Sequence, residues 1–429
     1  MKKILYLLIG FLGLGLTMPH AYADNGISTL RLKTNFNIWR VNLNKAEWLK
    51  TYPKMNWNGF EVKWPDTLEG EAKNKALSYV KSSDAVGVDF AQVRAYLEKI
   101  TSPEINREPQ DVSIKINDKG KIEFDGFAFN GQRIDFEKAF YLIQKAIRDR
   151  IEEVRLPIKI IPATINVLSD ELKQKGIQTL IATGESDFSN SPKNRRSNIR
   201  VGLASFSGRL VPPGTETGAG EILGLVDATT GYLPELVIKG DKTVPEYGGG
   251  LCQVSTTVYR AVLIGGFPIT ARTNHSYAVS YYDPQGLDAT IYPPDPDMKF
   301  VNDTPNMILL QTTTVGDKAY ANVYGTPVDR QVDLLGPWYY SYKSPPDSRT
   351  EYSTKIPPGD KVKLGEAHMG FKADWYRRIS YANPSPKEVL ERIHSDYEPR
   401  PQFTVIGIDP ENPPPEATPE HIDKVKLSD

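Results

Sequence analysis

The stretch "YGGGLCQVSTTVYRAV", residues 247–262, contains Cys252, the only cysteine of the 429 residues. Three glycines precede the thiol, and an apolar face with helical spacing follows it at Val254, Val258 and Val262. Two glycines and a proline shortly after residue 264 are typical of a helix end. The stretch therefore predicts a glycine-rich turn that enters a helix at about Gln253, with the thiol at the junction.

A thiol in this place favours nucleophilic chemistry. A cysteine attacks as its thiolate, and the positive end of a helix stabilises that anion. The backbone N–H groups of Gly249, Gly250 and Gln253 could receive an oxyanion, because glycines let a substrate approach the chain closely. The alternative is that Cys252 is a small buried apolar residue, since cysteine is among the most buried residue types.

A nucleophilic cysteine needs a base, and His275 is the best-placed candidate. It stands 23 residues after Cys252, in "RTNHSY", on the strand expected after the helix. Asp288, Asn274 or a backbone carbonyl could orient its imidazole. The alternatives are a structural histidine on a strand and, for Asp288, a turn residue after Gly286.

The chain begins with the pattern of an export signal. Two lysines, an apolar run and the small-x-small triplet Ala21–Ala23 predict a signal peptide over residues 1–23. We expect an extracytoplasmic protein that is secreted, associated with the cell wall, or anchored if the signal is retained. The single cysteine excludes an internal disulfide.

Charge and metal ligands exclude other classes of function. The formal net charge of −1 gives no electrostatic footprint for nucleic acid. The few histidines form no HExxH or Cys/His cluster, so we predict neither a metal nor a cofactor.

Periodicity divides the chain into segments and predicts a multidomain α+β fold. A weakly periodic N-terminal region precedes a helix–hairpin–helix–strand module with a turn at Lys119-Gly120. The motif-dense segment follows, in which residues 269–283 and 286–293 are expected to be strands of a mainly antiparallel sheet. A β-rich section and a disordered tail end the chain. The predicted boundaries are a signal at 1–23, an irregular region at 24–85, a module at 86–168, the central domain at 170–328, the β-rich section at 329–409 and the tail at 410–429.

Basic residues gather before the motif, at Arg195, Arg196 and Arg200. The main interpretation is a solvated helix face, and the alternative is contact with an anionic substrate.

The central segment resembles the VanW-like family. The resemblance rests on "NIRVGLASFSGRLVPPG", on the order GGG-x-CQVSTT, R-x-x-HS and G-x-DAT, and on "DMKFVNDTPNMILL". It covers about 185–325. Residues 86–168 look like the peptidoglycan-binding module that often precedes this domain, a weaker match, and the section after 329 resembles the tail behind many such domains. The stretch "TETGAGEIL" (215–223) departs from the family pattern and puts substrate preference in question.

The family is named from a glycopeptide-resistance cluster, and some members are regarded as cysteine L,D-transpeptidases. For this chain, the resemblance implies that Cys252 attacks a peptidoglycan stem peptide and that His275 moves the proton. The thioester would pass to an amine, with the Gly249–Gln253 backbone around the oxyanion. The R-x-x-HS motif implies substrate contacts for Arg272 and Ser276. The predicted partners are stem peptides and no nucleic acid. A membrane is a partner only if the signal is kept as an anchor. A non-catalytic wall-binding protein and a cysteine peptidase or amidase are the competing hypotheses.

Overall fold

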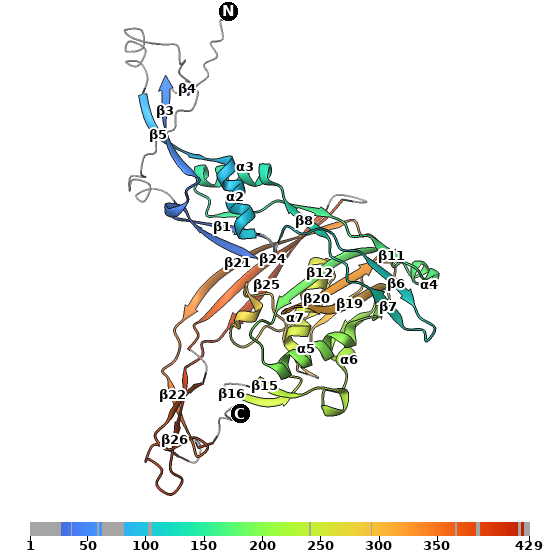
Figure 1. Cartoon of the computed structure of the whole chain (residues 1–429), viewed down its shortest axis with the longest axis vertical. Coiled ribbons are helices and arrows are strands. Elements are labelled where there is room, and N and C mark those ends of the chain that lie inside the picture. The colour runs from blue at the N-terminus through green and yellow to red at the C-terminus, as the bar shows by residue number, and fades with distance from the viewer. Residues whose placement is uncertain are drawn as a thin grey trace, which may run out of the picture. The chain divides into compact units, whose positions relative to one another are not determined.

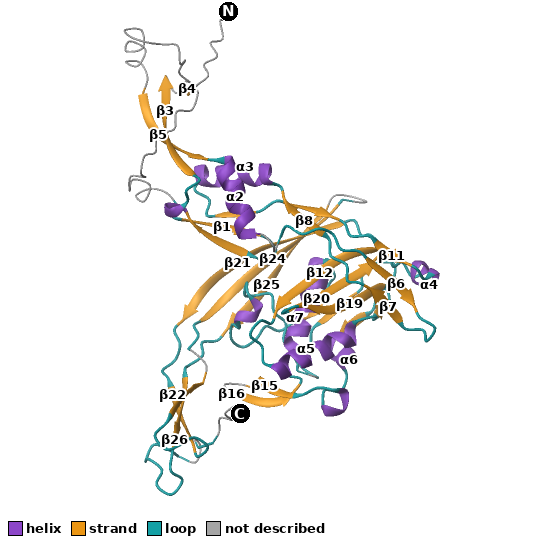
Figure 2. Cartoon of the chain, in the orientation of Figure 1, coloured by secondary structure: helices purple, strands orange, loops and turns teal. Residues whose placement is uncertain are grey.

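The structure is a computed structural model that describes residues 27–35, 37–57, 60–61, 81–101, 105–239, 242–292, 294–364, 367–382, 387–418 and 422–423 (Figures 1 and 2). The predicted signal peptide lies outside these residues. Within the described part, no helix combines the length and apolar content that crossing a membrane requires. The chain forms two compact units, Met1–Arg107 with Gln132–Ile160, and Glu108–Gly131 with Ile161–Asp429.

The first unit packs two helices against a small sheet. The sheet order is β2-β1-β9, with β1 antiparallel to β2 and parallel to β9. Strands thus occupy part of the region predicted to be irregular. The sequence did not reveal β1 and β2, because the alternation in a five-residue strand is too short to detect. The elements of this unit are β1 (Thr29–Lys33), β2 (Ile38–Asn42), η2 (Leu43–Lys45), β3 (Leu49–Trp57), β4 (Phe60–Glu61), β5 (Lys81–Val88), α2 (Phe90–Thr101), β8 (Gly131–Ile134), α3 (Phe136–Asp149), β9 (Glu153–Arg155) and β10 (Ile158–Ile161).

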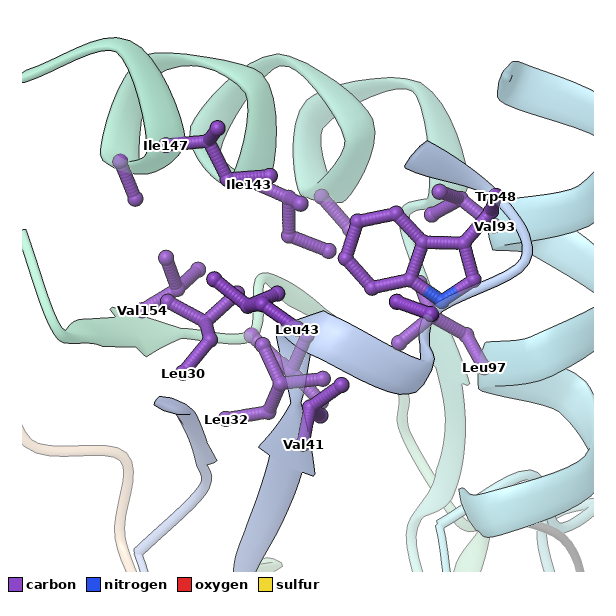
Figure 3. Packing of buried hydrophobic residues seen from close by; sticks show 14 of the residues in the cluster. Leu30, Leu32, Val41, Leu43, Trp48, Val93, Leu97, Ile143, Ile147 and Val154 are labelled. Atoms are coloured by element: carbon purple, nitrogen blue, oxygen red, sulfur yellow. The ribbon is translucent and has the colours of Figure 1, made fainter. Parts of the chain in front are cut away.

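The core of this unit lies between those helices and the sheet (Figure 3). Val93 and Leu97 of α2 are buried one turn apart, as the helical spacing predicts. Ile143 and Ile147 of α3 repeat this arrangement, and the indole of Trp48 lies among them. The two predicted helices are therefore confirmed, with one buried face each.

The second unit is built on an antiparallel four-stranded sheet with the order β12-β20-β19-β13. Helix α7 (Leu251–Ile264) contacts β12 and β20, while α5 (Lys193–Phe206) contacts β19 and α7 (Figure 1). The helix begins at Leu251, two residues before the expected start, and nearly all of its side chains are buried. The α+β class and the helix on a mainly antiparallel sheet are confirmed. The strands are β12 (Thr179–Asp187), β13 (Leu210–Val211), β19 (Ile308–Val315) and β20 (Lys318–Gly325).

Gly184 of β12 allows this close packing. A β-carbon at Gly184 would lie 2.3 Å from the carbonyl oxygen of Thr257 and 2.3 Å from the backbone nitrogen of Ala261, both in α7. Because those are backbone atoms, the helix itself would have to move. Gly184→Ala is therefore expected to lower the free energy of unfolding by about 1–3 kcal/mol.

Urea unfolding of the two variants Gly184→Ala and Gly220→Ala measures this effect. Gly220 lies in α6 (Ala219–Leu223), where an added β-carbon would be 3.5 Å from Asp297 Oδ2, an ordinary contact. Its variant should unfold close to the wild-type midpoint. Equal urea midpoints for both variants would show that the packing of α7 against β12 does not require a glycine at residue 184.

The remaining elements of this unit surround the central sheet. The hairpin β6–β7 turns at Gly120 as predicted, and β11 pairs in parallel with β6. Because Val112 and Ile114 share a core with Leu309 and Tyr324, the predicted module at 86–168 is divided between the two units. The elements are β6 (Val112–Ile116), β7 (Ile122–Asp125), β11 (Ile165–Val167), α4 (Asp170–Gln174), β14 (Glu216–Gly218), η3 (Ala228–Thr230), β15 (Pro234–Lys239), β16 (Lys242–Tyr247), β17 (Ile269–Ala271), η4 (Ser280–Tyr282) and β18 (Lys299–Val301).

The section after residue 329 is β-rich, as expected. It forms one sheet with the order β21-β24-β25 and another with the order β22-β26-β23. The described part of the predicted disordered tail is not free of contacts, since Asp423 accepts hydrogen bonds from Ser353 and Thr354. The strands are β21 (Arg330–Lys343), β22 (Arg349–Ser353), β23 (Lys361–Leu364), β24 (Gly370–Tyr381), β25 (Lys387–Tyr397) and β26 (Phe403–Gly407).

Candidate active site

Cys252 is the second residue of α7, at the end of the glycine turn. Gly248 and Gly250 have φ angles of 80° and 114°, a region that residues with a β-carbon rarely adopt. Gly250 is the N-cap of the helix. The thiol is half-buried, and its Sγ lies 3.6 Å from the carbonyl oxygen of Ile291. The glycines therefore place the thiol at the first turn of the helix.

Several backbone N–H groups of this turn are left without a partner among the described residues. The N–H of Leu251 donates to Gly248 at 3.0 Å, and that of Gln253 donates to Gly250 at 2.9 Å. The N–H groups of Gly249, Gly250 and Cys252 make no hydrogen bond within the described part of the chain. These three donors are thus available to an oxyanion on a carbon bonded to Sγ, whereas the predicted donor Gln253 N–H is already engaged. The side chain of Gln253 is buried and donates to the carbonyl of Asp187.

His275 and Asp288 form a buried pair. The His275 Nδ1 atom lies 2.6 Å from Asp288 Oδ2, and the same oxygen accepts the backbone N–H of His275 at 2.8 Å. Since Nδ1 is engaged, the hydrogen bond between His275 and Cys252 falls to Nε2. Thiol, imidazole and carboxylate therefore make one hydrogen-bonded chain, the arrangement of a catalytic triad.

The segments that carry the pair are not the expected strands. After β17 the chain continues as a loop with the short helix η4, and residues 286–292 form no strand. Buried side chains satisfy the backbone groups that a sheet would have paired. Arg260 donates to the carbonyls of Leu287 and Tyr282, and Thr256 Oγ1 bonds both the N–H and the carbonyl of Ala289. The strand prediction is confirmed only for Ile269–Ala271 and was wrong for the rest, because alternation cannot distinguish a strand from such a supported loop.

The other predicted site residues lie around the pair. Arg272 donates to the carbonyls of Asp288 and Gly286 and contacts Asp288 Oδ1 at 3.3 Å, so it holds the loop and the carboxylate. The Asn274 side chain donates to the carbonyls of His275 and Asp396 and not to the imidazole. Ser276 is exposed beside His275. Substrate contacts for Arg272 and Ser276 remain predictions.

Two tyrosines complete the site and were not predicted. Tyr282 stacks on the imidazole of His275 with ring centroids 4.6 Å apart. Tyr397, at the end of β25, donates from its hydroxyl to Asp288 Oδ1 at 2.5 Å and accepts the N–H of Gly286 at 2.8 Å. Nothing in the sequence around Tyr397 connects it with a site more than 100 residues earlier.

The environment favours a thiolate–imidazolium pair. Burial alone raises the pKa of the Cys252 thiol, but the hydrogen bond and charge of His275, together with the charge of Arg195, lower the pKa below its usual value. Burial alone lowers the pKa of His275, yet its bonds to Asp288 and Cys252 raise that pKa to about 9. Burial raises the pKa of Asp288, while His275 and then Arg272 and Tyr397 hold it well below its usual range. Between the lowered thiol pKa and about 9, the three groups carry charges of −, + and −.

This charge pattern predicts the pH dependence of thiol reactivity. Alkylation of Cys252 by iodoacetamide should reach half its maximal rate at a pH below the ordinary thiol pKa of about 8.5. In His275→Ala, burial remains and the imidazolium is gone, so the midpoint should rise above that value. Stopped-flow alkylation between pH 5 and 10 measures both midpoints. Identical midpoints would show that His275 does not act on the thiol.

The three predicted arginines of α5 differ from one another. Arg200 is exposed, as a solvated face requires, and Arg196 pairs with Asp317. Arg195 is half-buried and bonds Gln253, the residue after the thiol, so the solvated-face interpretation is wrong for Arg195. Across the described residues, no group of three or more His, Cys, Asp or Glu side chains is placed to hold a metal ion.

Comparison with known proteins places this site in a recognised domain. Residues 194–324 match the family model described as VanW like protein. The chain is 24% identical over 244 residues to the uncharacterized protein YoaR of Bacillus subtilis (strain 168), an alignment that covers 56% of this chain and 77% of YoaR. It is 26% identical over 148 residues to the vancomycin B-type resistance protein VanW of Enterococcus faecalis (strain ATCC 700802 / V583), covering 33% of this chain and 52% of that protein. No solved structure matches the chain. The chain therefore carries a VanW-like domain, which contains Cys252, His275 and Asp288.

Proposed function

We propose that this protein is a cysteine acyl-transferase of the L,D-transpeptidase type that acts on peptidoglycan stem peptides outside the cytoplasm. The observation that carries the proposal is the hydrogen-bonded chain from the Cys252 thiol through His275 to Asp288, at a helix N-terminus with an unused N–H. A cysteine that only fills the core does not require a paired imidazole and a buried carboxylate.

In the first half-reaction, the Cys252 thiolate attacks the carbonyl carbon of the third stem residue. The new C–S bond places negative charge on the carbonyl oxygen, and the N–H of Cys252 donates to it. The C–N bond then breaks, and the His275 imidazolium gives its proton to the leaving amine, D-alanine. The products are a thioester on Cys252, a free amino acid and a neutral imidazole.

In the second half-reaction, the side-chain amine of another stem attacks the thioester carbonyl. His275 takes the proton that the amine loses, the C–S bond breaks, and an amide joins the two stems. Asp288 keeps Nδ1 protonated throughout, so that Nε2 faces the sulfur. The thiolate–imidazolium pair is restored, and no outside reactant is consumed.

Three observations support peptidoglycan as the substrate. One relative is named as a vancomycin resistance protein. The motif order resembles a family with members regarded as wall cross-linking enzymes. The N-terminal residues have the pattern of an export signal. Residues 86–168 are proposed to contribute to wall binding.

Product analysis tests the proposal and its competitors. The purified protein is incubated with a tetrapeptide stem and an amine acceptor, and the products are identified by mass. A cross-linked product with release of the terminal amino acid, absent in Cys252→Ala, is expected. A tripeptide without any cross-linked product would show that the enzyme hydrolyses the stem instead of transferring it. An unchanged mixture would leave the non-catalytic wall-binding hypothesis.

A further inference from the structure

Arg195 is a half-buried cation with neutral partners. Its Nη1 donates to Ser191 Oγ at 2.6 Å and its Nη2 to Gln253 Oε1 at 3.0 Å. The guanidinium carbon lies 4.3 Å from the ring centroid of Tyr281. Two of the five N–H groups of the guanidinium thus donate hydrogen bonds, and these hold the guanidinium in one orientation.

No carboxylate of the described chain pairs with this guanidinium. Its neighbour Arg196 pairs with Asp317, and Arg272 pairs with Asp288. The nearby carboxylate of Glu235 accepts the backbone N–H of Arg195 at 3.2 Å. A partly buried charge is stabilised by an opposite charge, which a bound ligand can supply.

Arg195 lies next to the nucleophile. Gln253, which it holds, follows Cys252 directly, and a β-carbon on Gly250 would lie 3.1 Å from Arg195 Cγ. Its charge also lowers the pKa of the Cys252 thiol. An anion bound by Arg195 would therefore lie near the bond that Cys252 attacks.

We propose that Arg195 binds the free carboxylate of the residue that the acyl donor carries beyond the scissile bond. The inference rests on the proposed function and assigns a residue to its donor site. Gln253 and Ser191 orient the guanidinium, which can meet a carboxylate with two parallel N–H bonds. Tyr281 covers one face of the guanidinium and limits its exposure to water.

Two alkylating reagents test the anion site without a substrate. Iodoacetate and iodoacetamide form the same kind of thioether on Cys252 and release iodide, but only iodoacetate is an anion. In Arg195→Gln, the ratio of the iodoacetate rate to the iodoacetamide rate should fall by about tenfold, because one nearby charge is lost. Arg195→Lys should keep part of the ratio, and Arg200→Gln, on the exposed side of α5, should keep all of it.

If Arg195 only activates the thiol, both reagents slow equally and the ratio stays constant. That outcome overturns the inference. Both rates are measured at a pH above the pKa of the Cys252 thiol in each variant, so that the thiol is fully ionised. Circular dichroism confirms that the variants fold.

A second measurement separates this inference from the proposed function. Donor peptides with a terminal carboxylate or a terminal amide are compared in the wild type and in Arg195→Gln. The KM for the carboxylate donor should rise at least about tenfold, while the KM for the amide donor stays within about twofold. If neither donor reacts in the wild type, the proposed function fails, and the reagent ratio still decides whether Arg195 binds an anion.

Discussion

Replacing Asp288 by asparagine is expected to lower kcat by about 10³ to 10⁴-fold while the protein still folds. Asp288 Oδ2 accepts both the Nδ1–H and the backbone N–H of His275. An asparagine that presents its amide N–H₂ to the ring favours the tautomer with the proton on Nε2, which cannot accept the thiol proton. The carboxylate charge that stabilises the imidazolium is lost as well. Initial rates with the tetrapeptide donor measure the effect.

Tyr397→Phe is a milder perturbation of the same Asp288 carboxylate. It removes the hydroxyl that donates to Asp288 Oδ1 but leaves the bond to His275 in place. We expect a loss of about tenfold, the effect of one charge-assisted hydrogen bond. The alkaline limb of the rate, set by the His275 pKa of about 9, should not move to lower pH, because Asp288 stays ionised without this bond. A loss for Asp288→Asn no larger than for Tyr397→Phe would remove Asp288 from the triad.

Replacing Cys252 by serine is expected to abolish acyl transfer, with a loss of about 10⁴-fold or more in kcat. A hydroxyl is a far weaker acid than a thiol, so the thiolate–imidazolium pair that the site stabilises cannot form. The two side chains are close in size, and α7 should keep its place on the sheet. Intact-mass detection of the acyl-enzyme and turnover of the donor measure the loss.

The same variant discriminates against the non-catalytic hypothesis. A protein that only binds the wall would retain wall binding and its role in cells when Cys252 becomes serine. Ser255, one helical turn further along α7, is fully buried and offers a control position, because Ser255→Ala leaves the thiol and its partners unchanged. Loss of function in Cys252→Ser with retention in Ser255→Ala would contradict the binding-only hypothesis.

Several helices and one hairpin could be predicted from local patterns in the sequence. The helices at Phe90–Thr101 and Phe136–Asp149 and the hairpin at Gly120 have short-range signals, namely a 3.6-residue apolar period and a turn glycine. The helix after the glycines was found within two residues of its start. Each of these elements depends on residues close together in the chain, which is why a single sequence reveals it.

The loop that holds His275 and Asp288 could not be derived in this way. Its backbone is satisfied by Arg260 and Thr256 from α7 and by Arg272, and these contacts leave no periodic pattern. The choice of Asp288 over Asn274 as the orienting group also needed the structure, since both are polar residues near the histidine in the chain.

The sequence by itself determined the candidate nucleophile and base, because a lone cysteine after three glycines and a histidine in a following motif can be recognised from residue type and order. Only the tertiary structure decided what surrounds them. Tyr397 reaches Asp288 from the section behind the family domain, and Arg195 reaches the residue beside the thiol from another helix. These contacts join residues that are distant in the chain, and their energies come from burial and charge that exist only after the elements pack together.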